Sequence, residues 1–350
     1  MAKPDLYICH TAYHLLIALV RAMRAGGGQA LWRSEQIPNA EALAASGKLE
    51  GVFSEVAVLR ESRWPGVVTG PLGHFRNRRA YEKAGVGPKL NKNAYGNIRI
   101  SNDWSVAGRY LQDCRAPHIL CEDTVGGTLD TDQHLLTEQR AAADFARRPY
   151  LYWGDSPWCS LVESEDASRC TLFGPEKLVT DCKAVESEDP DKCTLFPREK
   201  LCKFSARDML ASLTAEEKAA VRRVFVSRPL PEDPAVYAEA TLLLPRSFVQ
   251  DGLMDQAEQD AIFKAVAAKY ARGPLFIKTH PRDDTDYTAL FPGATALDRT
   301  MPSEVLNFCL PGKFRRAVTV QSWVLRGFTA AEENIFLSLD EARELVSQTE

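Results

Sequence analysis

The sequence lacks any long run of apolar residues. Its apolar stretch from Leu15 to Val20 is far shorter than the ~20 residues that a helix needs to span a bilayer. The first residues, Met-Ala-Lys-Pro-Asp, lead straight into a strand-like run and do not form a signal peptide. We therefore expect a cytoplasmic protein without a membrane-spanning anchor.

Paired metal-binding clusters and a strong excess of one charge are also absent. The nine cysteines form no pair of close Cys/His clusters of the zinc type, so we expect free thiols and no metal site. With 43 Lys and Arg against 47 Asp and Glu, the formal net charge is −4. This balance gives no general reason to expect a nucleic-acid partner, although it says nothing about local basic patches.

The first half of the chain alternates strand-like and helix-like segments, a pattern typical of a parallel sheet with crossover helices. At 350 residues the chain exceeds one typical core, so two domains are expected, with one large domain as the alternative. Strands are predicted at residues 5–9, 30–33, 55–60, 97–101 and 118–121, and helices at 11–23 and 104–112.

A second alternating series follows. The capping boxes Thr214–Glu217 and Asp255–Glu258 predict helices that run to about residues 224 and 270. Further strands are expected at 241–244, 275–278, 316–321 and 334–339, and further helices at 303–309, 322–328 and from 340. The predicted fold is α/β, with two Rossmann-like domains, residues 1–215 and 216–350, that face each other across a central cleft.

The middle of the chain contains an internal duplication. "VESEDASRCTLFGPEKL" from Val162 returns as "VESEDPDKCTLFPREKL" from Val185, a shift of 23 residues. Two copies are too few for a solenoid, which needs about three. We interpret residues 162–201 as two similar strand-plus-turn units in a local insertion, to which we assign no function.

Polar residues follow several predicted strands. Ligands of open parallel sheets bind beyond the carboxyl ends of the strands, so these residues are the candidates for a site. They are His10, Thr11, Asp103, Glu122, Asp123 and Gly126 in the first domain, and Lys278, His280, Pro281, Gln321 and Ser322 in the second. We expect His10 to face the cleft, whereas His14 is interpreted as a packing or surface residue.

Each of these candidates has two interpretations. His280 precedes a proline and is therefore held in an extended conformation, where Lys278 and Arg282 would favour an anion; the alternative is a solvated polar loop. Glu122 and Asp123 are either solvated turn residues or a general base placed after a buried strand. Glu304 could simply complement a helix dipole, and Ser322 is either an N-cap or a phosphate ligand.

The segment from Gly73 to Lys92 is basic, with one acid, Glu82, and two interleaved aromatics, Phe75 and Tyr81. Its cations are Arg76, Arg78, Arg79, Lys83, Lys89 and Lys92. It is either a solvated helix face or a patch for an anionic membrane or an anionic glycan acceptor.

Six stretches, taken in order, resemble a known family. They are "LYICHTAYHLLIAL", "EDTVGG", "LLLPRSFVQDGLMDQAEQDAIF", "FIKTHPRDDTDY", "MPSEVLNF" and "VTVQSWVLRGF". They are similar to the bacterial sialyltransferases of glycosyltransferase families 52 and 38, which include lipooligosaccharide and capsule polysialic acid enzymes. The resemblance is most specific over residues 241–306.

This resemblance implies a GT-B fold, a CMP-activated sialic acid donor, a glycan acceptor, and inversion at the anomeric carbon without a metal or other cofactor. The acidic motif implies a base at Glu122 or Asp123, of which we choose Asp123, although Thr124 and Val125 separate it from Gly126. The acceptor would lie on this first-domain side, near His10, Thr11 and Asp103.

In the second domain the resemblance implies a donor site. His280 and Pro281 match residues that contact the donor phosphate, with a cationic imidazole expected. Glu304 would bind the ribose, and Gln321-Ser322 match a serine pair that holds the phosphate. The alternatives are transfer of another nonulosonic acid, transfer from a UDP-hexose, or a non-catalytic saccharide-binding protein. We expect the protein on the inner face of the cytoplasmic membrane or free in the cytoplasm.

Overall fold

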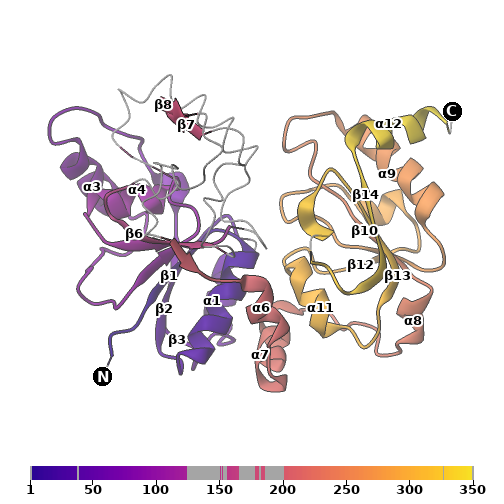
Figure 1. Ribbon diagram of the computed structural model, residues 1–350, viewed down its shortest axis with the longest axis horizontal. Helices are drawn as coiled ribbons and strands as arrows, with labels where there is room; N and C mark the ends of the chain where they lie inside the picture. The colour runs from indigo at the N-terminus through magenta and orange to yellow at the C-terminus, as the bar shows by residue number, and fades with distance from the viewer. Residues whose placement is uncertain are drawn as a thin grey trace. The chain divides into compact units, whose positions relative to one another are not determined.

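The computed structural model describes residues 2–37, 39–123, 150, 152, 156–164, 178–180, 183–185, 201–325 and 327–348 (Figure 1). The chain forms two compact units, Met1–Leu213 and Thr214–Glu350. Each unit has its own sheet, and each is described by itself below. Within the described residues, no helix combines the length and the apolar character needed to cross a membrane.

The first unit is built on a seven-stranded sheet in the order β3-β2-β1-β4-β5-β6-β9, and all of its pairings are parallel. This confirms the predicted parallel α/β architecture. The strands are β1 (Leu6–Cys9), β2 (Gln29–Ser34), β3 (Phe53–Leu59), β4 (Ile98–Ile100), β5 (His118–Leu120), β6 (Cys159–Ser164) and β9 (Leu201–Lys203). A separate antiparallel pair, β7 (Leu178–Thr180) and β8 (Lys183–Val185), lies within the duplication, most of which is outside the described residues.

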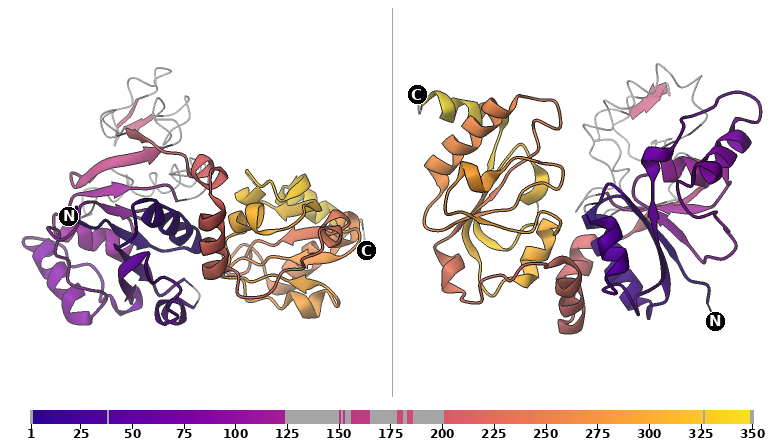
Figure 2. Two further views of the ribbon diagram at one scale, coloured as in Figure 1. Left: turned by 90° about the horizontal axis from the view of Figure 1, so that it is seen from below. Right: turned by 180° about the vertical axis from the view of Figure 1, so that it is seen from behind.

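Helices cover both faces of this sheet (Figure 2). They are α1 (Ala12–Arg24), α2 (Ala40–Ala45), α3 (Gly73–Ala84), α4 (Val106–Asp113) and α6 (Ala206–Ala211), with a 3₁₀ turn η1 (Glu61–Arg63). Leu6 and Ile8 of β1 share a core with Tyr110 of α4, whereas Tyr7 and Cys9 line a pocket with residues of α1. Because side chains alternate along a strand, α4 and α1 cover opposite faces.

The second unit has a five-stranded parallel sheet in the order β12-β11-β10-β13-β14. Its strands are β10 (Thr241–Leu244), β11 (Leu275–Ile277), β12 (Thr295–Ala296), β13 (Phe314–Val320) and β14 (Ala331–Leu337). Its helices are α7 (Ala215–Phe225), α8 (Ala235–Ala238), α9 (Gln256–Tyr270), α10 (Tyr287–Leu290), α11 (Leu306–Cys309) and α12 (Leu339–Ser347), with 3₁₀ turns η5 (Ser303–Val305) and η6 (Trp323–Leu325). Helices α9 and α12 pack on one face of the sheet with Leu243 and Val318.

The helices α7 and α9 begin at the residues that the predicted capping boxes indicated, with one difference. Thr214 and Glu217 form the predicted capping box of α7. Asp255 caps α9 by accepting the Glu258 N–H, but the Glu258 carboxylate binds Arg343, so only half of the second predicted box is formed.

The helix predicted at 322–328 is wrong. Among the described residues of this segment, the structure has one 3₁₀ turn, η6. Gln321 and Gly327, which bound this turn, have φ angles of 45° and 71°. The left-handed conformation of Gly327 is incompatible with a right-handed helix that continues to residue 328. Similarly, the segment 303–309 forms the turn η5 and the four-residue helix α11.

Candidate active site

The residue predicted as the base, Asp123, is bound by a histidine from α1. The Nε2 atom of His14 lies 2.9 Å from Oδ1 of Asp123 and 3.2 Å from its carbonyl oxygen. Thr11 caps α1 by accepting the His14 N–H at 3.1 Å, which places the His14 ring in the first helical turn. His14 was interpreted as a packing or surface residue; it is instead the buried partner of Asp123.

A second contact determines which nitrogen of the His14 ring carries the proton. The backbone N–H of His10 donates to Nδ1 of His14 at 3.2 Å, so a neutral His14 carries its proton on Nε2 and donates it toward Asp123. The His14 side chain is 1% exposed and that of Asp123 is 32% exposed. Within the described residues, Oδ2 of Asp123 receives no hydrogen bond. In this pair the partly exposed carboxylate of Asp123 is the group that a ligand can reach, and His14 holds its Oδ1 atom.

His10, which was expected to face the cleft, is buried within the first unit against Glu61. Its Nε2 atom lies 3.3 Å from Glu61 Oε1, and Glu61 also accepts hydrogen bonds from the Ser34 hydroxyl and the Ala107 N–H. Burial alone would raise the pKa of the Glu61 carboxyl, but these three donors together lower it. Glu61, which sequence reasoning missed, thus fixes His10 and, through the His10 backbone, His14.

The other predicted residues of the first unit lie in different surroundings. Glu122 is buried, and its Oε2 atom accepts the Ala206 N–H at 3.3 Å at the start of α6. Asp103 is completely buried just before α4, which leaves it no exposed atom. Thr11 is exposed beside its cap contact. Gly126 lies outside the described residues, as do Thr124 and Val125.

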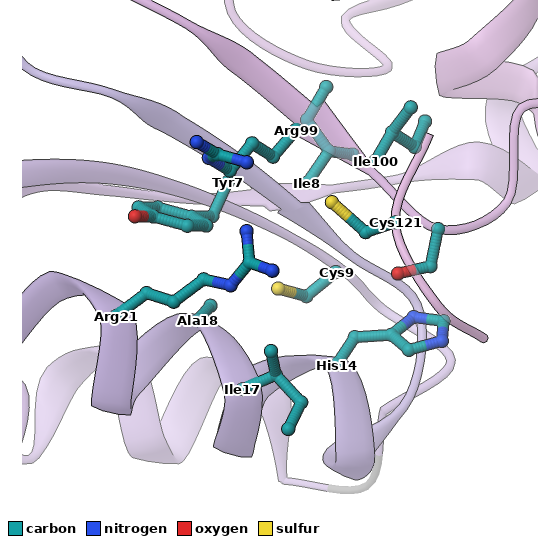
Figure 3. A pocket seen from close by; sticks show the side chains of 11 residues that line it. Tyr7, Ile8, Cys9, His14, Ile17, Ala18, Arg21, Arg99, Ile100 and Cys121 are labelled. Atoms are coloured by element: carbon teal, nitrogen blue, oxygen red, sulfur yellow. The ribbon is translucent and has the colours of Figure 1, made fainter. Parts of the chain in front are cut away.

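Residues of β1, β4 and α1 line a pocket, and His14 is one of them (Figure 3). Its charged wall consists of Arg21 and Arg99, and both bind the Glu163 carboxylate, at 2.6 to 2.8 Å for Arg21 and 2.7 Å for Arg99. Two buried thiols, Cys9 and Cys121, complete it, and burial raises the pKa of Cys9 to about 12. The pocket is therefore stabilised by an internal ion-pair network and does not offer a reactive thiolate.

In the second unit, His280 lies in the loop that follows β11. Its Nδ1 atom accepts the Arg282 N–H at 3.2 Å and lies 3.4 Å from the Ser247 hydroxyl. The neutral ring therefore carries its proton on Nε2, which takes part in no hydrogen bond within the described residues. The geometry leaves one N–H donor available to a ligand.

The His280 ring does not carry the positive charge that was expected from the sequence. Burial, followed by the positive charges of Arg282 and Lys278, lowers the pKa of His280 to about 4. The imidazole is therefore neutral near neutral pH in this structure. Its Nε2–H can donate a hydrogen bond, but the ring carries no fixed positive charge.

The ammonium group of Lys278 does not face solvent, as a ligand for an anion would. Its ammonium group donates to the carbonyl oxygens of Thr279, at 2.8 Å, and Arg299, at 3.2 Å, and burial lowers its pKa to about 8. The carboxylates of Asp298 and Glu304 partly counter this effect of burial. In this conformation Lys278 holds the loop around His280.

An arginine that sequence reasoning missed connects two of these loops. Arg246, which follows β10, donates to the Gln321 carbonyl oxygen at 2.7 Å and to Asp251 at 3.2 Å. Asp251 also binds Arg282, at 3.0 Å, next to His280. Arg246 belongs to the "PRSFVQDG" stretch that follows a predicted strand, so its position was visible in the sequence although its role was not.

The remaining candidates lie after β12 and β13. Glu304 is partly buried behind Pro302, where burial raises the pKa of its carboxyl despite a contact with the Ser303 hydroxyl at 3.3 Å. The Ser322 hydroxyl accepts the Val324 N–H at 3.3 Å. Among the described residues, no group of three or more His, Cys, Asp and Glu side chains could hold a metal ion.

Comparison with known proteins confirms the resemblance to family 52. Residues 198–325 match the model of glycosyltransferase family 52, and this region contains His280, Glu304 and Ser322. An uncharacterized protein of Haemophilus influenzae is 31% identical over 116 residues, which are 33% of this chain. Those residues are 37% of the relative, so the match spans just over a third of its length.

The solved structures show the fold. The α/β-galactoside α-2,3-sialyltransferase of Photobacterium phosphoreum superposes with a TM-score of 0.53 at 11% identity, over 99% of this chain and 94% of that chain. A UDP-GlcNAc 2-epimerase of Methanocaldococcus jannaschii gives a TM-score of 0.48 at 11% identity, over 99% and 91%. The superposition on the sialyltransferase, together with the two parallel α/β sheets, confirms the predicted GT-B fold.

Proposed function

Because residues 198–325 match glycosyltransferase family 52, we propose that the chain is an inverting, metal-independent sialyltransferase. It moves sialic acid from a CMP-activated donor to a hydroxyl of a bacterial surface glycan. One observation carries the proposal: the matched region brings His280, Arg246 and Gln321 together at the carboxyl ends of three adjacent strands, β11, β10 and β13. This is where parallel sheets bind nucleotides.

The second unit would bind the donor. The CMP phosphate gains negative charge as the bond between its oxygen and the anomeric carbon breaks. The Nε2–H of His280 and the hydroxyl of Ser322 are the proposed hydrogen-bond donors for this charge, and Arg246 and Arg282 supply positive charge nearby. Glu304 is proposed to bind the ribose hydroxyls, and Lys278 to keep the loop of His280 and Pro281 in place.

The first unit would supply the base. The acceptor hydroxyl attacks the anomeric carbon and must lose its proton in the same step, so a carboxylate within hydrogen-bond distance is needed. Asp123 fits this role because one of its oxygens is held by His14 while the other is left for the acceptor. Glu122 is engaged at the start of α6 and has a structural role in this mechanism.

A thermal-shift screen with CMP, CDP, UMP, UDP and GDP tests the proposal. A ligand that binds only the native state raises stability by about 2.7 kcal/mol at a hundredfold excess over its Kd, so CMP should give a clear increase in Tm. A shift with UDP and none with CMP would instead indicate transfer from a UDP-hexose. CMP binding without turnover of CMP-sialic acid would indicate another nonulosonic acid or a non-catalytic saccharide-binding protein.

A further inference from the structure

Exposed large apolar side chains are concentrated in one short segment of the first unit. Of the six among the described residues, Val67, Val68, Leu72 and Phe75 lie between residues 67 and 75. Leu72 is 71% exposed and Phe75 is 58% exposed. Single exposed apolar residues are ordinary, but several in one short segment are typical of an interaction surface.

This apolar segment is held firmly in place. The buried side chain of Asn77 accepts the Val68 N–H at 2.8 Å and donates to the Val68 carbonyl oxygen at 3.0 Å. The Gly73 N–H donates to the Gly70 carbonyl oxygen at 2.9 Å. The loop is thus anchored to α3, and its apolar side chains are displayed by a defined backbone.

Leu72 has a backbone conformation that disfavours its own side chain. Its φ angle is 64°, in the left-handed region that glycine and asparagine adopt more easily than leucine. With most of its surface exposed, Leu72 gains little from folding in return. A leucine at this position is therefore better explained by a contact outside the unit than by the stability of the fold.

The exposed face of α3 continues the surface with positive charge. The buried residues of this helix are Gly73, Asn77 and Tyr81. Arg76, Arg79 and Lys83 are exposed at spacings of three and four residues, and Phe75, next to Arg76, is exposed as well. The guanidinium of Arg79 lies 6.0 Å from the centre of the Phe75 ring.

Glu82, the acidic residue of α3, does not neutralise the exposed cations of this helix. Glu82 binds Arg78 at 3.0 Å and accepts a hydrogen bond from the Tyr110 hydroxyl at 3.2 Å. The exposed face of α3 therefore presents three cations without an intervening carboxylate.

We propose that residues 67–83 form a docking surface for a bilayer that contains anionic phospholipids. Leu72 and Phe75 enter the interface between head groups and acyl chains, while Arg76, Arg79 and Lys83 contact lipid phosphates. An apolar anchor together with a basic patch provides the two signals that peripheral attachment requires. A soluble polyanionic glycan would use the cations but offers no apolar phase for Leu72, so the membrane is the favoured partner.

Flotation of the full chain with phosphatidylcholine vesicles, with and without phosphatidylglycerol, tests this surface. Each cation near an anionic surface contributes about fivefold in affinity, so the triple variant Arg76→Gln, Arg79→Gln, Lys83→Gln should bind anionic vesicles roughly a hundredfold more weakly. Removing the same charge from exposed positions of the second unit, with Lys264→Gln, Lys269→Gln, Arg272→Gln, should leave binding close to wild type.

The variant Leu72→Asn distinguishes a role of Leu72 in membrane binding from a role in the stability of the fold. Asparagine suits the left-handed backbone, so Tm should stay unchanged or rise while vesicle binding falls several-fold. Leu253→Asn, at another exposed apolar position, is the matched control and should bind normally. The proposal is overturned if the wild-type chain does not float with anionic vesicles, or if Leu72→Asn binds as tightly as wild type. Retained vesicle binding with loss of heparin binding in the triple variant would show a polyanion site instead.

Discussion

The Nε2 atom of His14 lies 2.9 Å from Oδ1 of Asp123, although the two residues are 109 positions apart in the chain. The contact joins the first turn of α1 to the loop that follows β5. It decides which member of an Asp–His pair meets a ligand, because the histidine is enclosed and the carboxylate is partly open. As the proposed base, Asp123 would need little reorganisation before it accepts a proton, because one of its oxygens is already held.

His14→Ala should lower kcat without changing the KM for the donor. The variant loses the donor that orients Asp123, and a misplaced catalytic group can reduce the rate by roughly 10²-fold. His14→Gln should restore part of the activity, because the amide can donate a hydrogen bond as Nε2 does. Steady-state kinetics of both variants test this. A rise in KM alone, with kcat intact, would assign His14 to substrate binding.

His280→Ala should reduce transfer by roughly 10²-fold, as expected for the loss of one preorganised donor. His280→Asn should retain more activity than His280→Ala, because the structure gives His280 the role of a neutral donor. If both variants are equally inactive while CMP still binds, the positive charge of an imidazolium is required, and the neutral assignment is wrong.

The low pKa of His280 also predicts a pH dependence of stability. Folding lowers this pKa from 6.5 to about 4, through burial first and then through Arg282 and Lys278. Between these values the unfolded chain binds more protons at this residue, so its contribution to stability rises as pH rises. Between about pH 7 and pH 5, His280→Asn should lose less stability than wild type, by up to about 2 kcal/mol. Urea unfolding of both proteins checks this, and parallel curves would contradict it.

Arg246→Ala should weaken CMP binding by about tenfold or more, because a charged hydrogen bond contributes about 1.5 to 3 kcal/mol. Arg246 connects the loop after β10 to Gln321, so its loss would also loosen the turn that carries Ser322. Isothermal titration with CMP measures the effect. Arg315→Ala, which removes an exposed arginine paired with Glu332, is the control and should bind CMP as wild type does.

Much of the fold could be predicted from the sequence, because burial and periodicity are visible in short stretches of residues. The apolar runs at Leu6–Cys9 and Thr241–Leu244 have few conformations other than buried parallel strands, and both were predicted close to their observed ends. The helix predicted after β13 was wrong because apolar periodicity does not show that Gly327 takes a left-handed backbone. The Gln321 carbonyl oxygen, just before this segment, accepts a hydrogen bond from Arg246, which lies in the loop after β10.

The sequence predicted the residue types of the candidate site but not their contacts. The strand-end rule selected Asp123 and His280 as candidates, and the structure has them after β5 and β11, each in the sheet of its own unit. The bond between His14 and Asp123 was not predicted, because Asp123 lies in a loop that the pattern around α1 does not specify. Lys278 looked like a free cation in the sequence, but its burial depends on the loop that contains Arg299.

The choice between Glu122 and Asp123 is the most direct test of the proposed mechanism. Asp123→Asn should abolish sialyl transfer from CMP-sialic acid while leaving the CMP-induced increase in Tm intact, because the base contacts the acceptor and not the nucleotide. Glu122→Gln should keep most of the activity, since its carboxylate binds the Ala206 N–H inside the unit. An active Asp123→Asn together with an inactive, folded Glu122→Gln would move the base by one residue. Normal transfer by both variants would contradict the mechanism.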